Sequence, residues 1–297
     1  MTIVMTLLVR DEEDILVANL EHHLAAGVDH VIATDNRSTD GTVDILDDYR
    51  SAGVLTLIHE DGDDYSQARW VTRMARMAAT EFDADWVINN DADEFWWTTG
   101  QDLPALFAGV PPSIQAVRAQ RANFIARPDD DQPFWRRMDI RQQPAQPHPG
   151  LDWPTLGPKV CHRGDPTIVI AQGNHSAGPE GAEPHEPTDD TDLEILHFPV
   201  RSRRRFENKI VLGGAAYARN TELPEEAGKI WRDMYAVHQD GRFDDAYARC
   251  VLDEETVRAG LHDGTLIRDR RLVDRLTALD LEACSGARVI DDGRAPR

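Results

Sequence analysis

The chain of 297 residues has few cysteines, three in all, and no long apolar segment. No apolar run approaches the ~20 residues that a membrane-spanning helix requires. Cys161, Cys250 and Cys284 are odd in number and widely spaced, which fits neither a disulfide framework nor a metal-binding motif. Residues 2–9 are apolar but lack a basic segment before them and a cleavage site after them, so they indicate a buried strand. We therefore expect a cytoplasmic protein without an integral membrane segment.

Positive charge is also scarce. The formal net charge is −21, and lysine occurs only at positions 159, 209 and 229. Such an acidic chain is a poor partner for nucleic acid or for an anionic membrane surface. An anionic substrate would have to be met by a metal ion or by locally placed Arg and Lys side chains.

Apolar strands and helical patterns alternate over the first hundred residues. Strands are expected at 2–9, 30–35, 54–60 and 84–90, and helices at 12–26, 42–50 and 66–80, the last with Ser66 as N-cap. This alternation predicts an open, mostly parallel sheet, in which ligands sit beyond the carboxyl ends of the strands. Polar residues follow all four predicted strands, at positions 10–12, 35–40, 60–64 and 91–94.

Asp91 and Asp93 follow the fourth predicted strand in the sequence WVINNDADEFWW. Two carboxylates that converge at a strand end repel each other, and a divalent cation relieves that repulsion. Hard oxygen ligands suit Mg²⁺ or Mn²⁺, which usually keep open positions for substrate phosphates. The motif therefore indicates a site for a nucleotide diphosphate. A solvated acidic turn is the plain alternative in a chain this acidic.

The second half of the chain is less regular. We expect a short helix at 103–110, an extended segment at 114–126, a long loop at 127–158, strands at 166–176 and 193–198, and a helix at 203–219 that Ser202 opens. Residues 177–192 are rich in Gly, Pro, Glu and Asp, which is typical of a mobile loop. The predicted units are a catalytic domain over 1–220, divided at residue 100 into a nucleotide-binding and an acceptor-side half, a helical extension over 221–284 and a disordered tail over 285–297.

These pieces, in this order, resemble the family 2-type glycosyltransferases with the GT-A fold. The matching segments are VRDEEDILVANLEHHLAAGVDHVIATDNRSTDGT, NNDADEFWW, GNH at 173–175 and LHFPVRSRRRFENKIVLGG at 196–214. The resemblance implies a Rossmann-like, mostly parallel α/β sheet flanked by helices. It also implies a metal-dependent enzyme that moves a sugar from a nucleotide-diphosphate sugar to an acceptor hydroxyl or amine, with inversion favoured.

The resemblance places functional roles on individual residues. The nucleotide-sugar-binding residues would be Arg10, Glu12, Asp35, Ser38, Asp40, Asp91, Arg201 and Lys209. The metal ligands would be Asp91, Asp93 and His197, with His175 as the competitor of His197, and the catalytic residues would be His175, Asp93 and Glu94. The cofactor would be Mn²⁺ or Mg²⁺. The donor would be a UDP-sugar first, or a GDP- or dTDP-sugar, and the acceptor would be soluble or linked to a carrier.

Several alternatives stay open. The base of an inverting reaction has no clean counterpart, and the candidates are His175 and the acidic residues Glu183, Glu186, Asp189, Asp190 and Asp192. Trp96 and Trp97 fit sugar stacking or the core equally well. A sugar nucleotidyltransferase is disfavoured because VRDEED stands where a Gly-rich loop would follow the first strand. A dehalogenase-type phosphatase is disfavoured because its D-x-D follows the first strand. A degenerate sugar-nucleotide-binding or scaffold protein is the non-enzymatic alternative.

Overall fold

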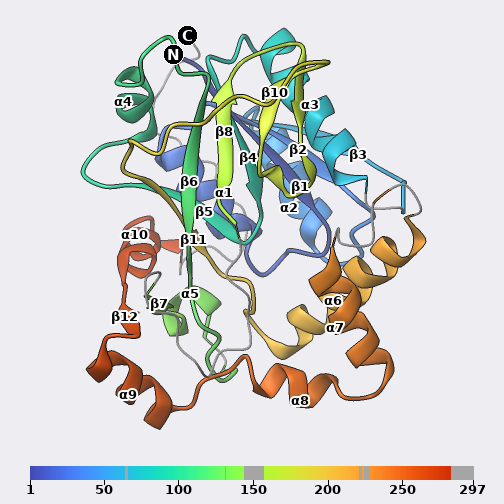
Figure 1. Cartoon of the computed structure of the whole chain (residues 1–297), viewed down its shortest axis with the longest axis vertical. Helices are drawn as coiled ribbons and strands as arrows, with labels where there is room; N and C mark the ends of the chain where they lie inside the picture. Colours follow the sequence, from blue (N-terminus) through green and yellow to red (C-terminus); the bar gives the residue numbers. More distant parts are fainter. Residues whose placement is uncertain (64–65, 131, 144–156, 221–222, 224–227, 282–297) are drawn as a thin grey trace.

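The computed structural model describes residues 1–63, 66–130, 132–143, 157–220, 223 and 228–281. Its N-terminal part alternates strands and helices as predicted (Figure 1). The elements are β1 (Ile3–Val9), α1 (Leu16–Ala25), β2 (His30–Asp35), α2 (Thr42–Ser51), β3 (Leu55–His59), α3 (Gln67–Glu81) and β4 (Trp86–Asp91). Helix α1 begins four residues later than predicted, because Glu12 to Ile15 form a turn in which Ile15 N donates to Glu12 O at 3.1 Å. Ser66 precedes α3, but its side chain makes no capping hydrogen bond.

The strands form one eight-stranded sheet in the order β3-β2-β1-β4-β8-β6-β11-β5. Neighbours among β1 to β4 are parallel, and β6 (Ala116–Asn123) is parallel to β11 (Leu193–His197). Strand β8 (Lys159–Arg163) is antiparallel to both β4 and β6, and β5 (Glu94–Thr98) is antiparallel to β11. The predicted α/β fold with a mostly parallel sheet is confirmed.

Strand β5 was not predicted. It follows β4 after two residues in sequence, yet it pairs with β11 at the far edge of the sheet order. Its aromatic side chains explain this placement. Trp96 is fully buried and donates from Nε1 to Asn90 Oδ1 at 3.1 Å, and Trp97 stacks on His22 with ring centroids 5.5 Å apart. Trp96 is therefore a core residue, and Trp97 is partly buried against that core.

Strand β1 explains why the N-terminal run is continuously apolar. Its odd-numbered residues, such as Ile3 and Met5, join the core beneath α1 and α2, whereas Val4 joins a second core beneath α3. A strand covered by helices on both faces has no polar side, as is usual for parallel sheets.

The remaining elements follow β4 and β5. They are α4 (Leu103–Ala108), α5 (Phe134–Arg137), β7 (Ile140–Gln142), β9 (Ile168–Ile170), the 3₁₀ turn η1 (Gln172–Asn174), β10 (Ala177–Pro179), α6 (Arg203–Arg219), α7 (Lys229–Gln239), α8 (Phe243–Ala248), α9 (Glu254–Asp263), β12 (Leu266–Arg268) and α10 (Arg271–Ala278). Helix α6 matches its predicted range, and Ser202 Oγ caps it by accepting from Arg205 N at 3.1 Å.

The C-terminal region is helical with one exception. Strand β12 pairs antiparallel with β7, and Leu272 and Leu276 of α10 are buried in the main core. This region is thereby tied to the middle of the chain. Part of the segment that was predicted to be mobile forms β10, and the predicted tail at 285–297 lies outside the described residues.

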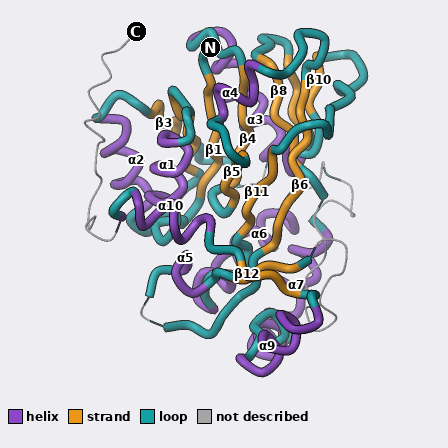
Figure 2. The backbone as a smooth tube through the Cα atoms, turned by 90° about the vertical axis from the view of Figure 1, so that its left-hand side faces the viewer, coloured by secondary structure: helices purple, strands orange, loops and turns teal. Residues whose placement is uncertain are grey.

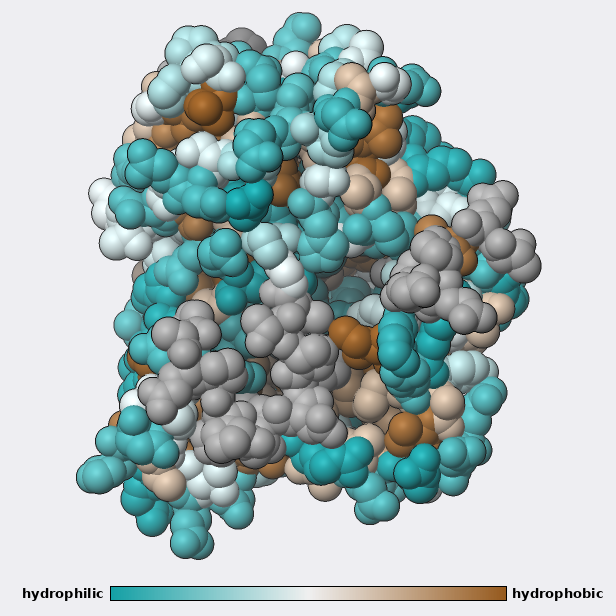
Figure 3. Space-filling view, viewed as in Figure 1, coloured by the Kyte–Doolittle hydropathy of each residue, from teal (hydrophilic) through white to brown (hydrophobic). Residues whose placement is uncertain are grey.

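The carboxyl ends of β6 and β11 lie at the candidate functional site. Strands β6 and β11 run side by side and end near α6 (Figure 2). The described surface is mostly hydrophilic on the face in Figure 3, in line with the net charge of −21. Among large apolar side chains of the described residues, only Met1 and Val169 are exposed. None of the described helices combines the length and the apolar character needed to cross a membrane.

Candidate active site

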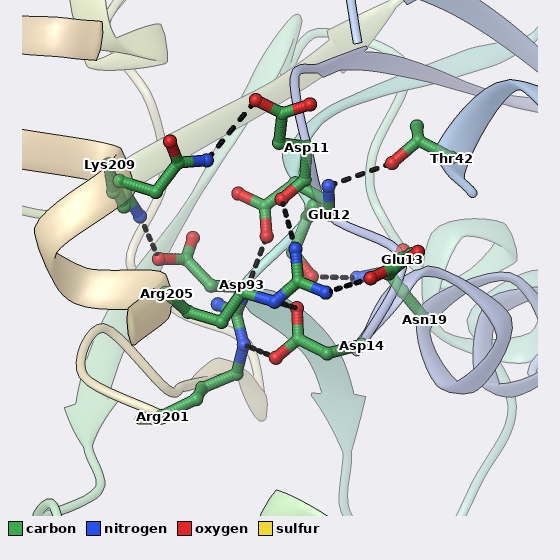
Figure 4. A network of polar contacts seen from close by, with 12 residues as sticks. Asp11, Glu12, Glu13, Asp14, Asn19, Thr42, Asp93, Arg201, Arg205 and Lys209 are labelled. Atoms are coloured by element: carbon green, nitrogen blue, oxygen red, sulfur yellow. Dashed lines mark hydrogen bonds and ion pairs between the residues drawn. The ribbon is translucent and has the colours of Figure 1, made fainter. Parts of the chain in front are cut away.

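Asp93 lies in the two-residue turn between β4 and β5, where the fold buries it. Its side chain is 3% exposed, and its carbonyl oxygen accepts from Phe198 N at 2.9 Å, which ties the turn to the end of β11. Asp93 Oδ2 pairs with the Nζ of Lys209 from α6 (Figure 4). The same oxygen lies 3.5 Å from His197 Nε2. One carboxylate oxygen thus faces a lysine and a histidine from two distant segments.

His197 is held as a neutral side chain with a defined tautomer. Its Nδ1 lies 2.7 Å from Asn123 Oδ1, an acceptor, so Nδ1 carries the proton and Nε2 offers its lone pair towards Asp93. Burial lowers the pKa of His197 to about 4 against the opposing effect of Asp93. Asn123 and His197 are register partners on β6 and β11, so the sheet itself sets this contact.

The carboxylate of Asp93 remains ionised. Burial alone would raise the pKa of Asp93, but the positive charge of the neighbouring Lys209 outweighs that effect and holds the pKa well below its ordinary value. Burial would likewise lower the pKa of Lys209, but Asp93 and Glu12 outweigh it and raise that pKa. The pair is therefore a full charge pair at neutral pH.

Asp91 belongs to a second cluster on the other side of the turn. Its Oδ2 pairs with Lys159 of β8, whose Nζ also lies 3.4 Å from Glu94 Oε1. Arg121 Nη1 donates to the same Glu94 oxygen at 3.1 Å. Glu94 is fully buried, and burial raises its pKa to about 7 against the opposing effect of Lys159. Among the described residues, no hydrogen bond or ion pair joins Asp91 to Asp93 or His197.

The GNH segment braces Asp91. Asn174 Nδ2 donates to Asp91 Oδ1 at 3.3 Å, and Gln67 Nε2 donates to the same oxygen at 3.4 Å. Asn174 is buried and adopts a φ of +59°, a left-handed conformation that is uncommon outside glycine. His175 is exposed and lies 2.7 Å through Nδ1 from Pro158 O. The segment thus supports one carboxylate of the motif and leaves its histidine accessible.

The acidic turn before α1 and the basic start of α6 interlock (Figure 4). Arg201 pairs with Glu12 and, at 2.7 Å, with Asp14, while Arg205 Nη1 donates to Asp40 Oδ2 at 2.7 Å. Arg201 is 4% exposed, so these pairs are largely shielded from solvent. They fix α6 over the strand ends and so place Lys209. In this arrangement Arg201 Nε and Nη2 already donate to the carboxylates of Asp14 and Glu12.

Arg10 and the turn after β2 surround the opening of this region. Arg10 Nε is buried and has no hydrogen-bond partner among the described residues, and burial lowers the pKa of Arg10. Ser38 Oγ accepts from Asp11 N at 2.9 Å, and Asp35 Oδ1 accepts from Ser38 N at 3.3 Å. Asp40 caps α2 by accepting from Thr42 N at 3.0 Å. A cavity of about 20 Å³, room for one water molecule, lies between Arg10, Glu12, Arg201 and Lys209.

The structure thus brings Asp93, His197 and Lys209 into contact, with Glu12 and Arg201 beside them. Sequence reasoning overlooked Lys159, Arg121, Asn123 and Arg205, which hold the site residues in place. The scarcity of lysine offered a signal for Lys159. No comparable signal marked Asn123 or Arg121, because their roles arise from strand pairing.

Two acidic residues of the segment 183–192 lie away from the candidate active site. Asp189 Oδ2 accepts from Arg118 Nη1 at 2.6 Å, and Glu186 lies 3.8 Å from the same guanidinium. Arg118 precedes Asn123 by five residues on β6, which corresponds to ~16 Å along the strand. These two carboxylates therefore lie well away from Asp93 in this structure.

The donor set at Asp93 is compatible with a small divalent ion. No group of three or more His, Cys, Asp or Glu residues is arranged to hold a metal ion in the part of the chain that the structure describes. Asp93 and His197 nevertheless present an ionised oxygen and a nitrogen lone pair 3.5 Å apart. Mg²⁺ usually takes only one or two protein carboxylates and completes its shell with water and substrate phosphates. Two protein ligands are sufficient for that type of site.

Comparisons with known proteins support part of this interpretation. Residues 2–106, about a third of the chain, match the sequence profile of Glycosyltransferase family 92. The similarity covers only this segment, and it agrees with the glycosyltransferase resemblance noted in the sequence. A comparison with curated proteins found no match.

Solved structures show weak similarity. The Staphylococcus aureus protein TarS matches with a TM-score of 0.40 and 14% identity over 82% of this chain and 43% of that chain, so the chain spans less than half of that protein's length. TarS residues 1–349 in complex with UDP match with a TM-score of 0.40 and 14% identity, over 87% of this chain and 78% of that chain. The Mycobacterium tuberculosis glucosyl-3-phosphoglycerate synthase in complex with Mn²⁺, UDP and glucosyl-3-phosphoglycerate matches with a TM-score of 0.29 and 21% identity. This match covers 41% of this chain and 44% of that chain.

Proposed function

We propose that this protein is a metal-dependent glycosyltransferase that moves a sugar from a nucleotide-diphosphate sugar to an acceptor hydroxyl or amine. The observation that carries the proposal is the pairing of Asp93 with a neutral His197 at the end of β11, in a chain whose first third matches a glycosyltransferase profile. UDP-sugars are the first donors to test, followed by GDP- and dTDP-sugars.

Asp93 and His197 would hold the divalent ion, and Asn123 would fix the histidine tautomer that makes binding possible. When bound, the ion would neutralise the negative charge that develops on the departing diphosphate. Asp91 lies across the turn, 30% exposed, and is braced by Lys159 and Asn174. We assign it to the ribose or the diphosphate side of the donor.

Two cations of the chain complete the donor site. Arg10 has a buried Nε donor without a partner, which a phosphate or nucleotide oxygen would satisfy. Lys209 stands between Asp93 and Glu12 and would supply a charge-assisted hydrogen bond to the diphosphate. Asp35 and Ser38 form the turn beside Arg10 and would contact the nucleoside.

His175 is the best candidate for the catalytic base. It is exposed next to the Asp91 brace, whereas Glu94 is sealed between Arg121 and Lys159. His175→Ala should lower transfer to an acceptor by 10²-fold or more while leaving donor binding unchanged. Equal loss of donor binding would assign His175 to the donor site instead.

The direct test is Mn²⁺-dependent turnover of nucleotide sugars. Asp93→Asn should lower it by ~10²-fold or more, since a buried electrostatic partner of the leaving group is lost. Asp189→Asn is the matched control, because Asp189 pairs with Arg118 away from the site. Donor binding without any turnover, in both the presence and the absence of Mn²⁺, would favour the sugar-nucleotide-binding scaffold. Equal turnover in Asp93→Asn would refute the metal site.

A further inference from the structure

Lysine is used in a selective way around the two carboxylates of the D-x-D motif. The chain has 32 basic residues of the Lys and Arg types, and three of them are lysines. Two of those three, Lys159 and Lys209, each form an ion pair with one aspartate of the motif. In a chain that otherwise uses arginine, this placement points to a need for a compact, single-point cation at these positions.

The two lysines differ in how firmly they are held. The Lys159 side chain is 2% exposed and contacts both Asp91 and Glu94 from within the sheet. The Lys209 side chain is 28% exposed and extends from helix α6, and among the described residues Asp93 is its one hydrogen-bond partner. Lys209 can therefore leave its aspartate without unfolding the sheet, and Lys159 cannot.

Two further groups that attract a cation lie near the Lys209 ammonium. Its Nζ lies 5.5 Å from the centre of the Trp231 ring, a cation–π distance, and Glu12 adds negative charge nearby. Lysine has a flexible four-carbon stem, so its ammonium can shift between such partners by rotation about side-chain bonds. Figure 4 shows the ammonium reaching Asp93 from the α6 side of the site.

The position of the ammonium conflicts with that of a metal ion. Lys209 Nζ pairs with Asp93 Oδ2, the oxygen that faces His197 Nε2 at 3.5 Å. A divalent ion bound by that oxygen and by the histidine would stand beside the ammonium. Two cations at one buried oxygen repel each other strongly, because water screens them little there.

We propose that Lys209 is a displaceable occupant of the cation position on Asp93, and that a divalent ion and the ammonium exclude each other there. The proposal rests on the metal-dependent function given above. In the metal-free protein Lys209 neutralises Asp93. When the ion binds, Lys209 moves away from Asp93 and becomes available to the diphosphate of the donor. Metal binding and diphosphate binding are thereby coupled through one side chain.

The first test measures Mn²⁺ binding to the nucleotide-free protein by electron paramagnetic resonance. Lys209→Met should bind Mn²⁺ at least ten-fold more tightly than the wild type, since the competing cation is gone. Lys229→Met is the matched control, because Lys229 pairs with Asp233 on α7 and should leave the affinity unchanged. Unchanged affinity in Lys209→Met would overturn the proposal.

Asp93→Asn separates this proposal from the proposed function. If Asp93→Asn abolishes Mn²⁺ binding while Lys209→Met leaves the Mn²⁺ affinity unchanged, the exchange between Lys209 and the ion is refuted and the metal site at Asp93 is supported. Undiminished Mn²⁺ binding in Asp93→Asn would sink the metal site itself.

The second test observes the lysine directly. The protein labelled with ¹³C at lysine Cε has only three labelled residues, and Lys209→Met assigns the resonance of Lys209. Saturating Mg²⁺ should shift that resonance towards the position of a free lysine and leave the resonance of Lys159 in place. An unmoved Lys209 resonance at saturating Mg²⁺ would overturn the proposal, even if Lys209→Met tightens Mn²⁺ binding through its charge alone.

Discussion

Asp91 and Asp93 are two residues apart, and each pairs with a lysine, yet the two pairs differ in their surroundings. Asp91 is 30% exposed and meets a buried lysine of β8, whereas Asp93 is 3% exposed and meets a partly exposed lysine of α6. In the first pair the aspartate faces the solvent and the cation is fixed. In the second pair the aspartate is fixed and the cation faces the solvent.

This difference indicates that the two lysines have different roles. A buried lysine between Asp91 and Glu94 compensates carboxylates that the sheet has desolvated, so its role is structural. A lysine on a helix surface compensates Asp93 only until another cation arrives. Similar ion pairs in adjacent positions can therefore serve stability in one case and exchange in the other.

The largest expected effect comes from the fixed pair. Lys159→Met leaves Glu94 buried beside Asp91 without its lysine, and removal of one partner of a buried ion pair costs about 3–5 kcal/mol. Urea unfolding should show this loss with and without Mn²⁺. A loss below about 1 kcal/mol would show that Arg121 alone compensates Glu94, and the contrast between the two lysines would fail.

Acid should act on buried histidines before it acts on the Asp93 pair. Burial lowers the pKa of His22 to about 4, so the folded state binds its proton less readily than the unfolded state does. The stability from neutral His22 is present above pH 6.5 and is lost as the pH falls towards 4, by about 1.4 kcal/mol per pH unit.

The variant His22→Gln tests this expectation. Its deficit in unfolding free energy relative to the wild type, measured by urea titration at each pH, should shrink from pH 7 to pH 4.5. A constant deficit would mean that the folded and unfolded states bind the His22 proton equally readily. Because the pKa of Asp93 lies well below its ordinary value, Asp93→Asn should leave the slope between pH 6.5 and 4.5 unchanged.

The displaceable pair should show a smaller loss that metal reverses. Lys209→Met leaves Asp93 buried without its ammonium and should cost about 1–3 kcal/mol in metal-free buffer. Millimolar Mn²⁺ should restore this loss, because an ion that binds only the folded state stabilises it. Thermal unfolding with and without Mn²⁺ measures both effects. A Lys209→Met deficit that persists at saturating Mn²⁺ would make Lys209 as structural as Lys159.

The smallest effect is expected from the residue that orients His197. Asn123→Ala removes the acceptor of His197 Nδ1 and should weaken Mn²⁺ binding about ten-fold, as is typical when the hydrogen-bond partner of a metal-binding histidine is lost. Gln120→Ala, an exposed position on the same strand, is the control. Equal Mn²⁺ affinity in Asn123→Ala, measured by calorimetry, would remove His197 from the metal site.

Local patterns predicted the first half of the fold well. Strand β2 matches its predicted range, and β1, β3 and β4 differ from theirs by one or two residues at an end. Each of these elements is a continuous apolar or helical segment bounded by a turn. The prediction missed β5 because EFWWT follows the D-x-D turn directly and carries no break of its own. Its pairing with β11 depends on a segment about a hundred residues away.

The contacts of the candidate site were only partly predicted. Asp93 and His197 were expected to meet, and the structure brings them to 3.5 Å. Asp91 was expected to join them, whereas its contacts in this structure are with Lys159, Asn174 and Gln67. Its proposed role at the donor remains a prediction.

The sequence by itself determined the alternation of strands and helices in the first half and the presence of carboxylates at the strand ends. Both follow from short-range periodicity and from the chain's own turns. Only the tertiary structure decided which cation each carboxylate meets. Lys159 and Lys209 lie 68 and 116 residues from their partners, and strand pairing and the packing of α6 bring them there. Contacts of that range depend on the whole fold, because no local pattern encodes the register between distant segments.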